Sequence, residues 1–161
     1  MDTFEIKIKI NDESELYNSF DPEQTTLNDE LLTYLTDRYT EKEFKKKAVL
    51  VFSGEGIDGA HLKSALHRHV ELELEKNAKQ KKLNYLKQLR LFLIGLIFVA
   101  AGILPGKYLS SIPIEILSII GSFAVWEAAN IWIVQNPGLN IRKRLLKRLL
   151  DADIMVEGNE V

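Results

Sequence analysis

Two groups of residues in this chain have types and spacings that could support chemistry. Glu127 and Asn130 lie three positions apart inside an otherwise apolar stretch, where a carboxylate needs a cationic partner or water. Gly54, Gly56 and Gly59 have the G-x-G-x-x-G spacing of loops that bind dinucleotide phosphates. Each group needs a particular structural context, and the rest of the sequence indicates whether that context exists.

The carboxylate lies about two turns from the end of the second of two apolar stretches. Folding the two stretches about the loop between them places Glu127 at the same depth as Arg90. This predicts an ion pair between Glu127 and Arg90, with Asn130 beside it. We interpret this intramembrane polar site as structural, fixing the register of two helices or holding subunits together. A polar path through a multimer and contact of Glu127 with interfacial water are the alternatives.

The glycine loop follows a predicted strand and begins a predicted helix, as a dinucleotide loop does. A dinucleotide site also needs another parallel strand with an acid about 20 residues further on, but this helix continues toward the apolar stretches. Glu55 and Asp58 would add negative charge where pyrophosphate binds. We therefore interpret the loop as a tight turn whose Asp58 caps the helix, with a phosphate loop formed by the three glycines as the alternative.

The spacing of the histidines does not predict a metal site. His67 and His69 project about 200° apart on a helix, and His61 is six residues from His67, so no two have the i, i+4 spacing of a zinc site. Cysteine is absent, which removes thiolate ligands and disulfides. No nucleophile–base arrangement has supporting context, so we expect no enzymatic activity, no catalytic residues, no metal and no cofactor.

Charge is strongly segregated along the 161 residues, although the net charge is only -2. Residues 1–44 contain twelve Asp and Glu against four Lys and Arg, whereas the segments beside the apolar stretches are basic. The acidic region argues against nucleic-acid binding. We expect it to be the docking surface for a cytoplasmic protein partner.

Two apolar stretches, 91–104 and 112–134, dominate the second half of the chain. Lys and Arg are dense on both outer sides, and the loop between the stretches carries only Lys107. The positive-inside bias then predicts a multi-pass protein with two spans and both termini in the cytoplasm, and we expect the plasma membrane. Two core helices of a soluble protein are the alternative, but the other amphipathic elements offer too little material to cover them.

Basic side chains flanking the stretches are expected to contact anionic lipid headgroups. They are Lys79, Lys81, Lys82, Lys87, Arg142, Lys143, Arg144, Lys147 and Arg148. Small residues at helical spacing permit close packing within the helix pair or between subunits, and we expect a homo-oligomer. These small residues are Gly95, Gly102, Ser118, Ser122, Ala124 and Ala128.

The first third of the chain predicts a small α/β domain. Apolar and polar residues alternate over 4–10, as in an edge strand, and the apolar run 48–52 is typical of a strand covered on both faces. Leucines at helical spacing predict a helix over 27–38 between them, with Thr26 or Asn28 as its cap. This is a βαβ pattern, and we expect residues 154–156 to add a third strand at an edge.

These elements divide the chain into four expected parts: a cytoplasmic α/β domain of residues 1–57 with 151–161, a stalk helix over 58–90, a two-helix transmembrane hairpin over 91–134, and a basic amphipathic helix over 139–150. The stalk is expected to kink or fray at 76–82. Asn136-Pro137-Gly138 is expected to end the second transmembrane helix, and the amphipathic helix is expected to lie on the cytoplasmic leaflet. Leu16, Tyr17 and Phe20 are expected to anchor the turn-rich segment 11–24.

The sequence thus favours a small integral membrane protein that acts as a non-enzymatic, oligomeric adaptor. The first alternative is a multimeric channel or membrane-perturbing effector with Glu127 and Asn130 on a polar path. The second is a nucleotide-sensing domain that uses the loop 54–59.

Overall fold

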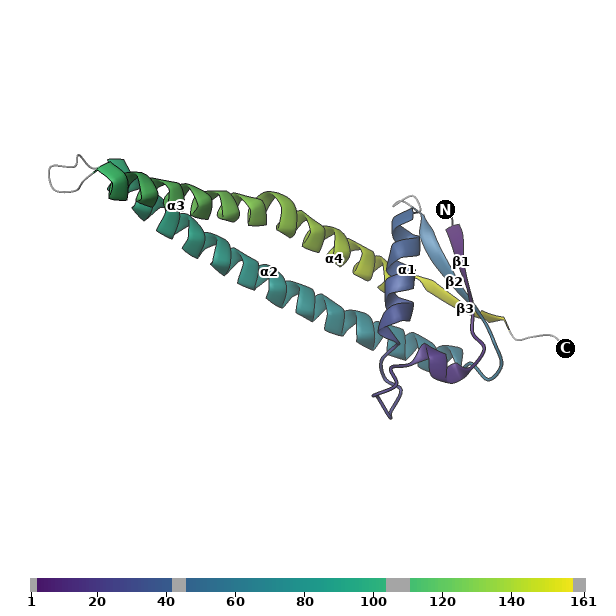
Figure 1. The fold of residues 1–161 in the computed structure, drawn as a ribbon. Helices are drawn as coiled ribbons and strands as arrows, with labels where there is room; N and C mark the ends of the chain where they lie inside the picture. Colours follow the sequence, from purple (N-terminus) through teal and green to yellow (C-terminus); the bar gives the residue numbers. More distant parts are fainter. Residues whose placement is uncertain (1–2, 42–45, 104–110, 158–161) are drawn as a thin grey trace. The chain divides into compact units, whose positions relative to one another are not determined.

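The computed structural model describes residues 3–41, 46–103 and 111–157 (Figure 1). Its elements are β1 (Thr3–Lys9), η1 (Glu13–Leu16), α1 (Asp29–Glu41), β2 (Lys47–Ser53), α2 (Gly59–Ile103), α3 (Ser111–Asn130), η2 (Ile131–Gln135), α4 (Asn136–Leu150) and β3 (Asp153–Glu157). Contacts divide the chain into two units. Unit 1 comprises residues 1–76 and 142–161, and unit 2 comprises residues 77–141.

Unit 1 is built on a three-stranded parallel sheet in the order β1-β2-β3. The central strand β2 joins the two ends of the chain, because Val51 pairs with Lys7 on one side and with Met155 on the other. The predicted βαβ pattern is confirmed, and so is the third strand from the C-terminal segment. Parallel pairing requires a long crossover between strands, which α1 supplies between β1 and β2.

The core of unit 1 lies on one face of this sheet. Alternate strand residues such as Ile6, Ile8 and Leu50 pack against helix residues such as Leu35 and Leu66. Helices α1, α2 and α4 all contribute to this single cluster. The prediction that β2 is covered on both faces is confirmed by burial. All five residues from Ala48 to Phe52 are buried, and these include Val49 and Val51, which do not belong to this cluster.

The C-terminal part of α4 contributes to this core. Leu145, Leu146 and Leu149, on the apolar side of the predicted basic amphipathic helix, are buried in the cluster. That side is therefore not available to a lipid surface. Only Ile141, at the start of the same side, is substantially exposed, at 48%.

Local capping fixes the entry to α1. Asn28 Oδ1 accepts a hydrogen bond from Glu30 N at 3.0 Å, so Asn28 is the cap rather than Thr26. Leu16 and Tyr17 anchor the preceding segment as expected, but Phe20 is 93% exposed, so its predicted anchoring role is wrong.

The chain before α1 folds around the carboxylate of Asp21. Its Oδ2 accepts hydrogen bonds from the backbone N and the hydroxyl of both Thr25 and Thr26, at 2.8 to 2.9 Å. Its Oδ1 accepts from Glu23 N at 3.2 Å. The side-chain hydrogen bonds of Thr25 and Thr26 lower the pKa of Asp21 below its ordinary value, because they stabilise the ionised form.

Unit 2 is an antiparallel pair of helices, formed by the second part of α2 and by α3 with its continuation (Figure 1). The two backbones touch at Gly95 and Gly121: a Cβ built on Gly95 would lie 2.8 Å from Gly121 O, and one built on Gly121 would lie 2.9 Å from Gly95 O. Only glycine permits this approach. Helix α2 reaches the contact without interruption, so the fray expected at residues 76–82 is wrong.

The second helix does not stop at Asn136-Pro137-Gly138 as the sequence predicted. A π-helical turn, η2, precedes the proline, and α4 continues through it. Asn136 N donates to Ile131 O across this wider turn. Proline within an α-helix lacks a donor and clashes with the carbonyl four residues earlier. A π-bulge widens the ladder at that point, which explains why the helix continues.

We predict that Asp21→Asn lowers the thermal midpoint of the protein at pH 7, because an amide NH₂ replaces the oxygen that receives four hydrogen bonds. The pKa of Asp21 is lower in the folded state, so its contribution is present above the unfolded pKa and is lost as pH falls through the folded value. The difference between variant and parent should therefore narrow below about pH 4.

Thermal unfolding between pH 7 and pH 3 measures this difference. Asp37→Asn is the matched control, since it removes the same charge from α1 without touching the loop. A deficit for Asp21→Asn that stays constant down to pH 3 would contradict the role given to the ionised carboxylate.

Candidate functional site

The intramembrane carboxylate predicted from the sequence has a basic partner on the other helix. Glu127 Oε1 accepts a hydrogen bond from Lys87 Nζ at 3.1 Å, and Glu127 Oε2 accepts one from Asn130 Nδ2 at 3.4 Å. The two helices thus present one acid, one base and one amide to each other. The side chains of Lys87 and Glu127 remain 56% and 40% exposed.

The expected partner Arg90 does not make this pair in the described structure. The predicted depth of the partner of Glu127 was nearly right, since Lys87 lies less than one turn from Arg90 on α2. The direction was wrong: at about 100° per residue, Arg90 points about 140° away from the direction of Gly95, whereas Lys87 points about 80° away. Because Gly95 marks the side of α2 that contacts α3, Lys87 is better placed to reach Glu127.

This pair belongs to a longer polar strip between the helices of unit 2, which the sequence analysis did not identify. Asn77 Nδ2 donates to Leu139 O at 3.2 Å, and Lys81 Nζ donates to Asn140 Oδ1 at 2.9 Å. Asn77 is only 6% exposed. We define the polar strip as Asn77, Lys81, Asn84 and Lys87 of α2 with Glu127, Asn130, Asn140 and the carbonyl of Leu139.

The spacing of polar residues on α2 was the signal for this strip. Asn77, Lys81 and Asn84 follow one another at four and three residues, which places them on one side of a helix. Asn84 is 7% exposed and its Oδ1 accepts from Gln80 Nε2 at 2.9 Å. Buried amides of this kind fix helix register through hydrogen bonds, and their atoms are committed to contacts within the chain.

The basic residues expected at lipid headgroups divide into two groups. Most side chains in the set are exposed on α2 and α4, and Arg148 is intermediate. Arg142, however, is engaged in unit 1, where its Nη2 donates to Glu73 Oε2 at 2.7 Å. Lys81 and Lys87 likewise donate to partners within the chain. These three cations therefore have hydrogen-bond partners within the chain.

Glu73 holds α2 and α4 together at the last residues that they contribute to unit 1. Its second oxygen accepts from Lys76 Nζ at 2.7 Å, and the carboxylate is only 12% exposed. Burial would raise the pKa of Glu73, but the hydrogen bond and charge of Lys76, aided by Arg142, outweigh burial and lower it. Nearby, buried His69 lies with its Nε2 3.2 Å from Asp29 Oδ1 on α1.

The glycine loop has the geometry of a tight turn. Gly56 adopts φ +76, which favours glycine, and a Cβ on Gly54 would lie 2.8 Å from Ile10 O. Asp58 Oδ1 accepts from Ala60 N at 2.9 Å and from His61 N at 3.3 Å. These amides at the start of α2 are the donors that a phosphate would use, and the Asp58 carboxylate already occupies them.

The histidines are separated by packing, and the described residues contain no group of three or more His, Cys, Asp or Glu able to hold a metal ion. The His61 ring lies 5.3 Å from that of Tyr17, whereas His69 is buried beside Asp29.

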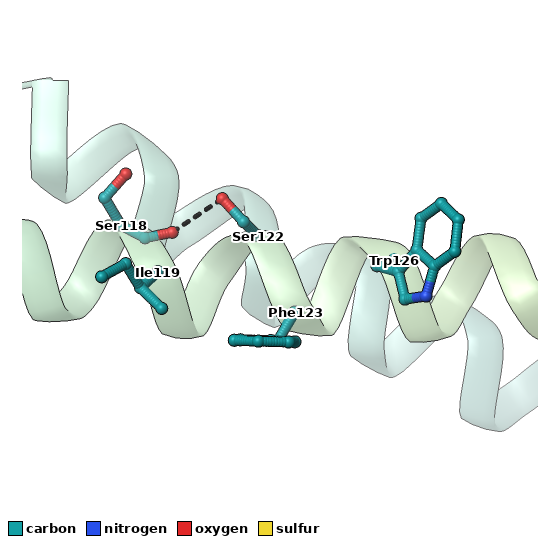
Figure 2. Close-up of a pocket in the computed structure, with 5 residues that line it drawn as sticks. All are labelled: Ser118, Ile119, Ser122, Phe123 and Trp126. Atoms are coloured by element: carbon teal, nitrogen blue, oxygen red, sulfur yellow. Dashed lines mark hydrogen bonds between the residues drawn. The ribbon is translucent and has the colours of Figure 1, made fainter.

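An apolar groove of about 510 Å³ lies on the surface of α3 (Figure 2). It is lined by Ser118, Ile119, Ser122, Phe123 and Trp126. The Ser122 hydroxyl donates to the carbonyl of Ser118 at 2.8 Å, so this hydroxyl is satisfied within its own helix. Phe123 and Trp126 are 70% and 72% exposed, and neither ring is covered by the chain.

Comparisons of the chain with protein-family models, with curated proteins and with solved structures gave no match. Its function is therefore inferred from its own residues.

We predict that Lys87→Met lowers the thermal midpoint of the helix pair in detergent, because it leaves Glu127 without its cation. Arg90→Met is the matched control. It removes the same charge less than one turn away and should leave stability within about 0.5 kcal/mol of the parent.

Thermal or denaturant unfolding in a fixed detergent measures both variants. If Arg90→Met costs more stability than Lys87→Met, then the partner of Glu127 is Arg90, as the depth argument from the sequence had placed it.

Proposed function

We propose that this chain is a small integral membrane protein in which α2 and α3 each cross the bilayer, and that it serves as a non-enzymatic, self-associating adaptor. Two helical segments, Gly59–Ala101 and Glu115–Leu150, are long and apolar enough to cross a membrane.

The exposure of the apolar segments carries the proposal. In their most apolar 18-residue windows, only 11% and 17% of the residues are buried. Ile97, Phe123 and Trp126 are each about 70% exposed. A core helix of a soluble protein would bury such residues, because leaving large apolar side chains in water costs about 1.5–3 kcal/mol each. Lipid is the covering material that fits this surface.

The sheet of unit 1 supports an even number of crossings. Strands β1 and β2 precede the apolar helices, β3 follows them, and β2 pairs with both. The chain must therefore return to the side from which it left. Together with the basic flanks and the single Lys107 between the apolar stretches, this favours both ends in the cytoplasm, with the plasma membrane as the site that we propose.

An adaptor role is favoured over catalysis by how the polar groups are used. The polar groups of the strip are hydrogen-bonded within the chain, and Asn77, Lys81 and Lys87 bond across the helix pair. Asp58 accepts the hydrogen bonds of the amides at the start of α2. Neither place offers free groups converging on a substrate. The acidic N-terminal region is the proposed surface for a cytoplasmic protein partner, and the exposed basic side chains beside the bilayer are proposed to contact anionic headgroups.

Self-association is supported by the positions of the small residues of unit 2, which lie both inside the helix pair and on its outer surface. Gly95, Gly121 and Ala128 are buried within the helix pair, whereas Ser118 and Ser122 line the outward groove on α3. That face lets another helix approach closely, because its small side chains lie between larger rings.

A channel is the second candidate, because the Glu127 side chain is 40% exposed and could face a path between several copies. The polar strip weighs against this function, since its groups already bond within one chain. The nucleotide-sensing alternative is disfavoured because Asp58 occupies the amides that a phosphate would need.

We predict that a cysteine in the loop between the apolar stretches, introduced by Ser110→Cys, reacts with a membrane-impermeant maleimide added outside intact cells. The chain has no cysteine of its own, so the label reports one site. Ser64→Cys, at an exposed position of unit 1, is the control and should react only after lysis.

Labelling of Ser64→Cys from outside intact cells would contradict the proposed topology and indicate the opposite orientation. Labelling of both variants without lysis, in a protein recovered from the soluble fraction, would exclude membrane insertion altogether.

We predict that Glu127→Gln changes the fraction of protein that assembles in detergent without changing ion flux across proteoliposomes, because an uncharged amide weakens the contact with Lys87. If the parent conducts ions and this conductance disappears in Glu127→Gln, the result would support the channel function and contradict the adaptor function. Glu115→Gln, at an exposed carboxylate of α3, is the matched control.

A further inference from the structure

Strand β1 is an edge strand, and no strand of the described sheet lies on its outer side. Ile10 N donates to Ser53 O at 2.9 Å, and the Ser53 hydroxyl donates to Ile8 O at 3.3 Å, so β1 turns the backbone groups of Ile8 and Ile10 toward β2. Backbone groups alternate in direction along a strand. The residues at odd positions of β1 therefore point their N–H and C=O groups away from β2, to the outer edge.

This outer edge offers main-chain donors and acceptors together with exposed side chains. The residues that present them are Thr3, Glu5, Lys7 and Lys9. A groove of about 380 Å³ follows the same edge, and it is lined by Glu5, Ile6 and Lys7 of β1 and by Tyr34 and Arg38 of α1. An edge of this kind is a template for another strand, although lysines on an edge strand often prevent such pairing.

The acid Glu5 makes β1 complementary to itself in one antiparallel register. Directly opposed side chains of an antiparallel pair lie on the same face and interact. When Ile6 lies on the two-fold axis, Glu5 of each copy is opposite Lys7 of the other, and Thr3 is opposite Lys9. The remaining opposed residues of the strand are all apolar. Within β1, this register sets no like charges against each other.

The other ways of pairing the two edges lack this complementarity. An axis at Glu5 sets Glu5 against itself, and an axis at Lys7 sets Lys7 against itself, which is destabilising. The opposite edge, β3, repels its own copy when fully overlapped, because Asp153 is then opposite Glu157. Pairing of β1 with β3 is head-to-tail and does not close by a two-fold axis. Charge and symmetry therefore select β1 of a second copy as the occupant.

We propose that two copies of the chain pair β1 with β1 in the antiparallel register centred on Ile6, which joins their sheets into one. The inference rests on the proposed self-association and names its surface in unit 1. Opposed residues such as Glu5 and Lys7 exchange two main-chain hydrogen bonds in this arrangement. Main-chain bonds supply the attraction, and the charged side chains fix the register.

Helix α1 adds a second contact along the same axis. The rings of Phe4 and Tyr39 are 5.2 Å apart, so the end of α1 lies beside the start of β1. The axis at Ile6 then brings Tyr34 of each copy toward Arg38 of the other, so that the two arginines do not face each other. Within one chain the Arg38 guanidinium already lies 5.4 Å from the centre of the Tyr34 ring. Between copies the same pair of groups would form a cation–π contact.

The test is oxidative cross-linking of the full chain in its own membranes, since the chain has no cysteine of its own. A tagged Glu5→Cys chain is co-expressed with a differently tagged Lys7→Cys chain. Opposed residues of a hydrogen-bonded pair have Cα atoms about 5.5 Å apart, which suits a disulfide. Two like chains place their cysteines diagonally, about 7–8 Å apart. The mixed disulfide should therefore form in higher yield than either disulfide between like chains.

Met155→Cys is the matched control for cross-linking. It places a cysteine at an exposed position of β3, on the opposite edge of the same sheet. It should form less disulfide than the mixed pair on β1.

Charge reversal in trans provides the second arm, measured by energy transfer between fluorescent fusions of the full chain in membranes. Lys7→Glu sets acids against acids and Glu5→Lys sets lysines against lysines, so each variant alone should lower the associated fraction about two- to five-fold, the scale of an exposed ion pair. Co-expression of the two variants sets acids against lysines and should restore association. Lys63→Glu, at an exposed position of α2, is the matched control.

The outcomes separate this inference from the proposed function. Self-association of the parent in membranes, without the mixed disulfide and without rescue in trans, overturns the β1 contact and leaves the groove on α3 as the surface of assembly. A parent that is monomeric in membranes overturns both. Disulfides that form mainly between two Glu5→Cys chains or between two Lys7→Cys chains overturn the register centred on Ile6.

Discussion

The return of the chain to β2 is the constraint on which the rest of this structure depends. The central strand of the sheet needs a neighbour on each side, and one neighbour comes from the beginning of the chain while the other comes from its end. The chain between β2 and β3 must therefore leave unit 1 and come back. Helices α2 and α4 are the outgoing and returning segments, and Glu73 joins them where they leave unit 1, through Lys76 of α2 and Arg142 of α4. The same return limits any membrane crossing to an even number of passes.

Much of unit 1 could be predicted from local pattern. The alternation in β1, the apolar run of β2 and the capping residue Asn28 each depend on a few neighbouring residues, and each was found in the structure. The burial of β2 could be predicted in the same way, because its unbroken apolar run indicated two covered faces and residues 48–52 are all buried. The exposure of Phe20 could not be predicted, because nothing in its apolar side chain indicated that it would be 93% exposed.

The candidate site could likewise be predicted only in part. Symmetry about the loop gave the depth of the partner of Glu127 to within one turn, because depth depends only on counting residues. The identity of the partner depends on helix rotation, which is set by the contact between Gly95 and Gly121. The polar strip was missed because Asn77 and Asn84 resemble solvated residues on a basic helix when read singly. The destination of α4 was missed for a similar reason: an amphipathic helix rich in Lys and Arg is typical of a lipid surface, yet its leucines complete a protein core.

The late arrival of β3 has a consequence for how the protein is made. About a hundred residues separate β2 from its second neighbour, so this pairing has a high sequence separation and forms late. While the ribosome is still producing the apolar helices, β2 has one unpaired edge and the leucines of α4 are missing from the core. An unpaired edge on an apolar strand is prone to pair with other chains. For the membrane protein that we propose, insertion and completion of the sheet are therefore coupled in time. Slow insertion would prolong the period in which the nascent α/β unit can aggregate, and a chain truncated before β3 would be a target for quality control even with both apolar helices in place.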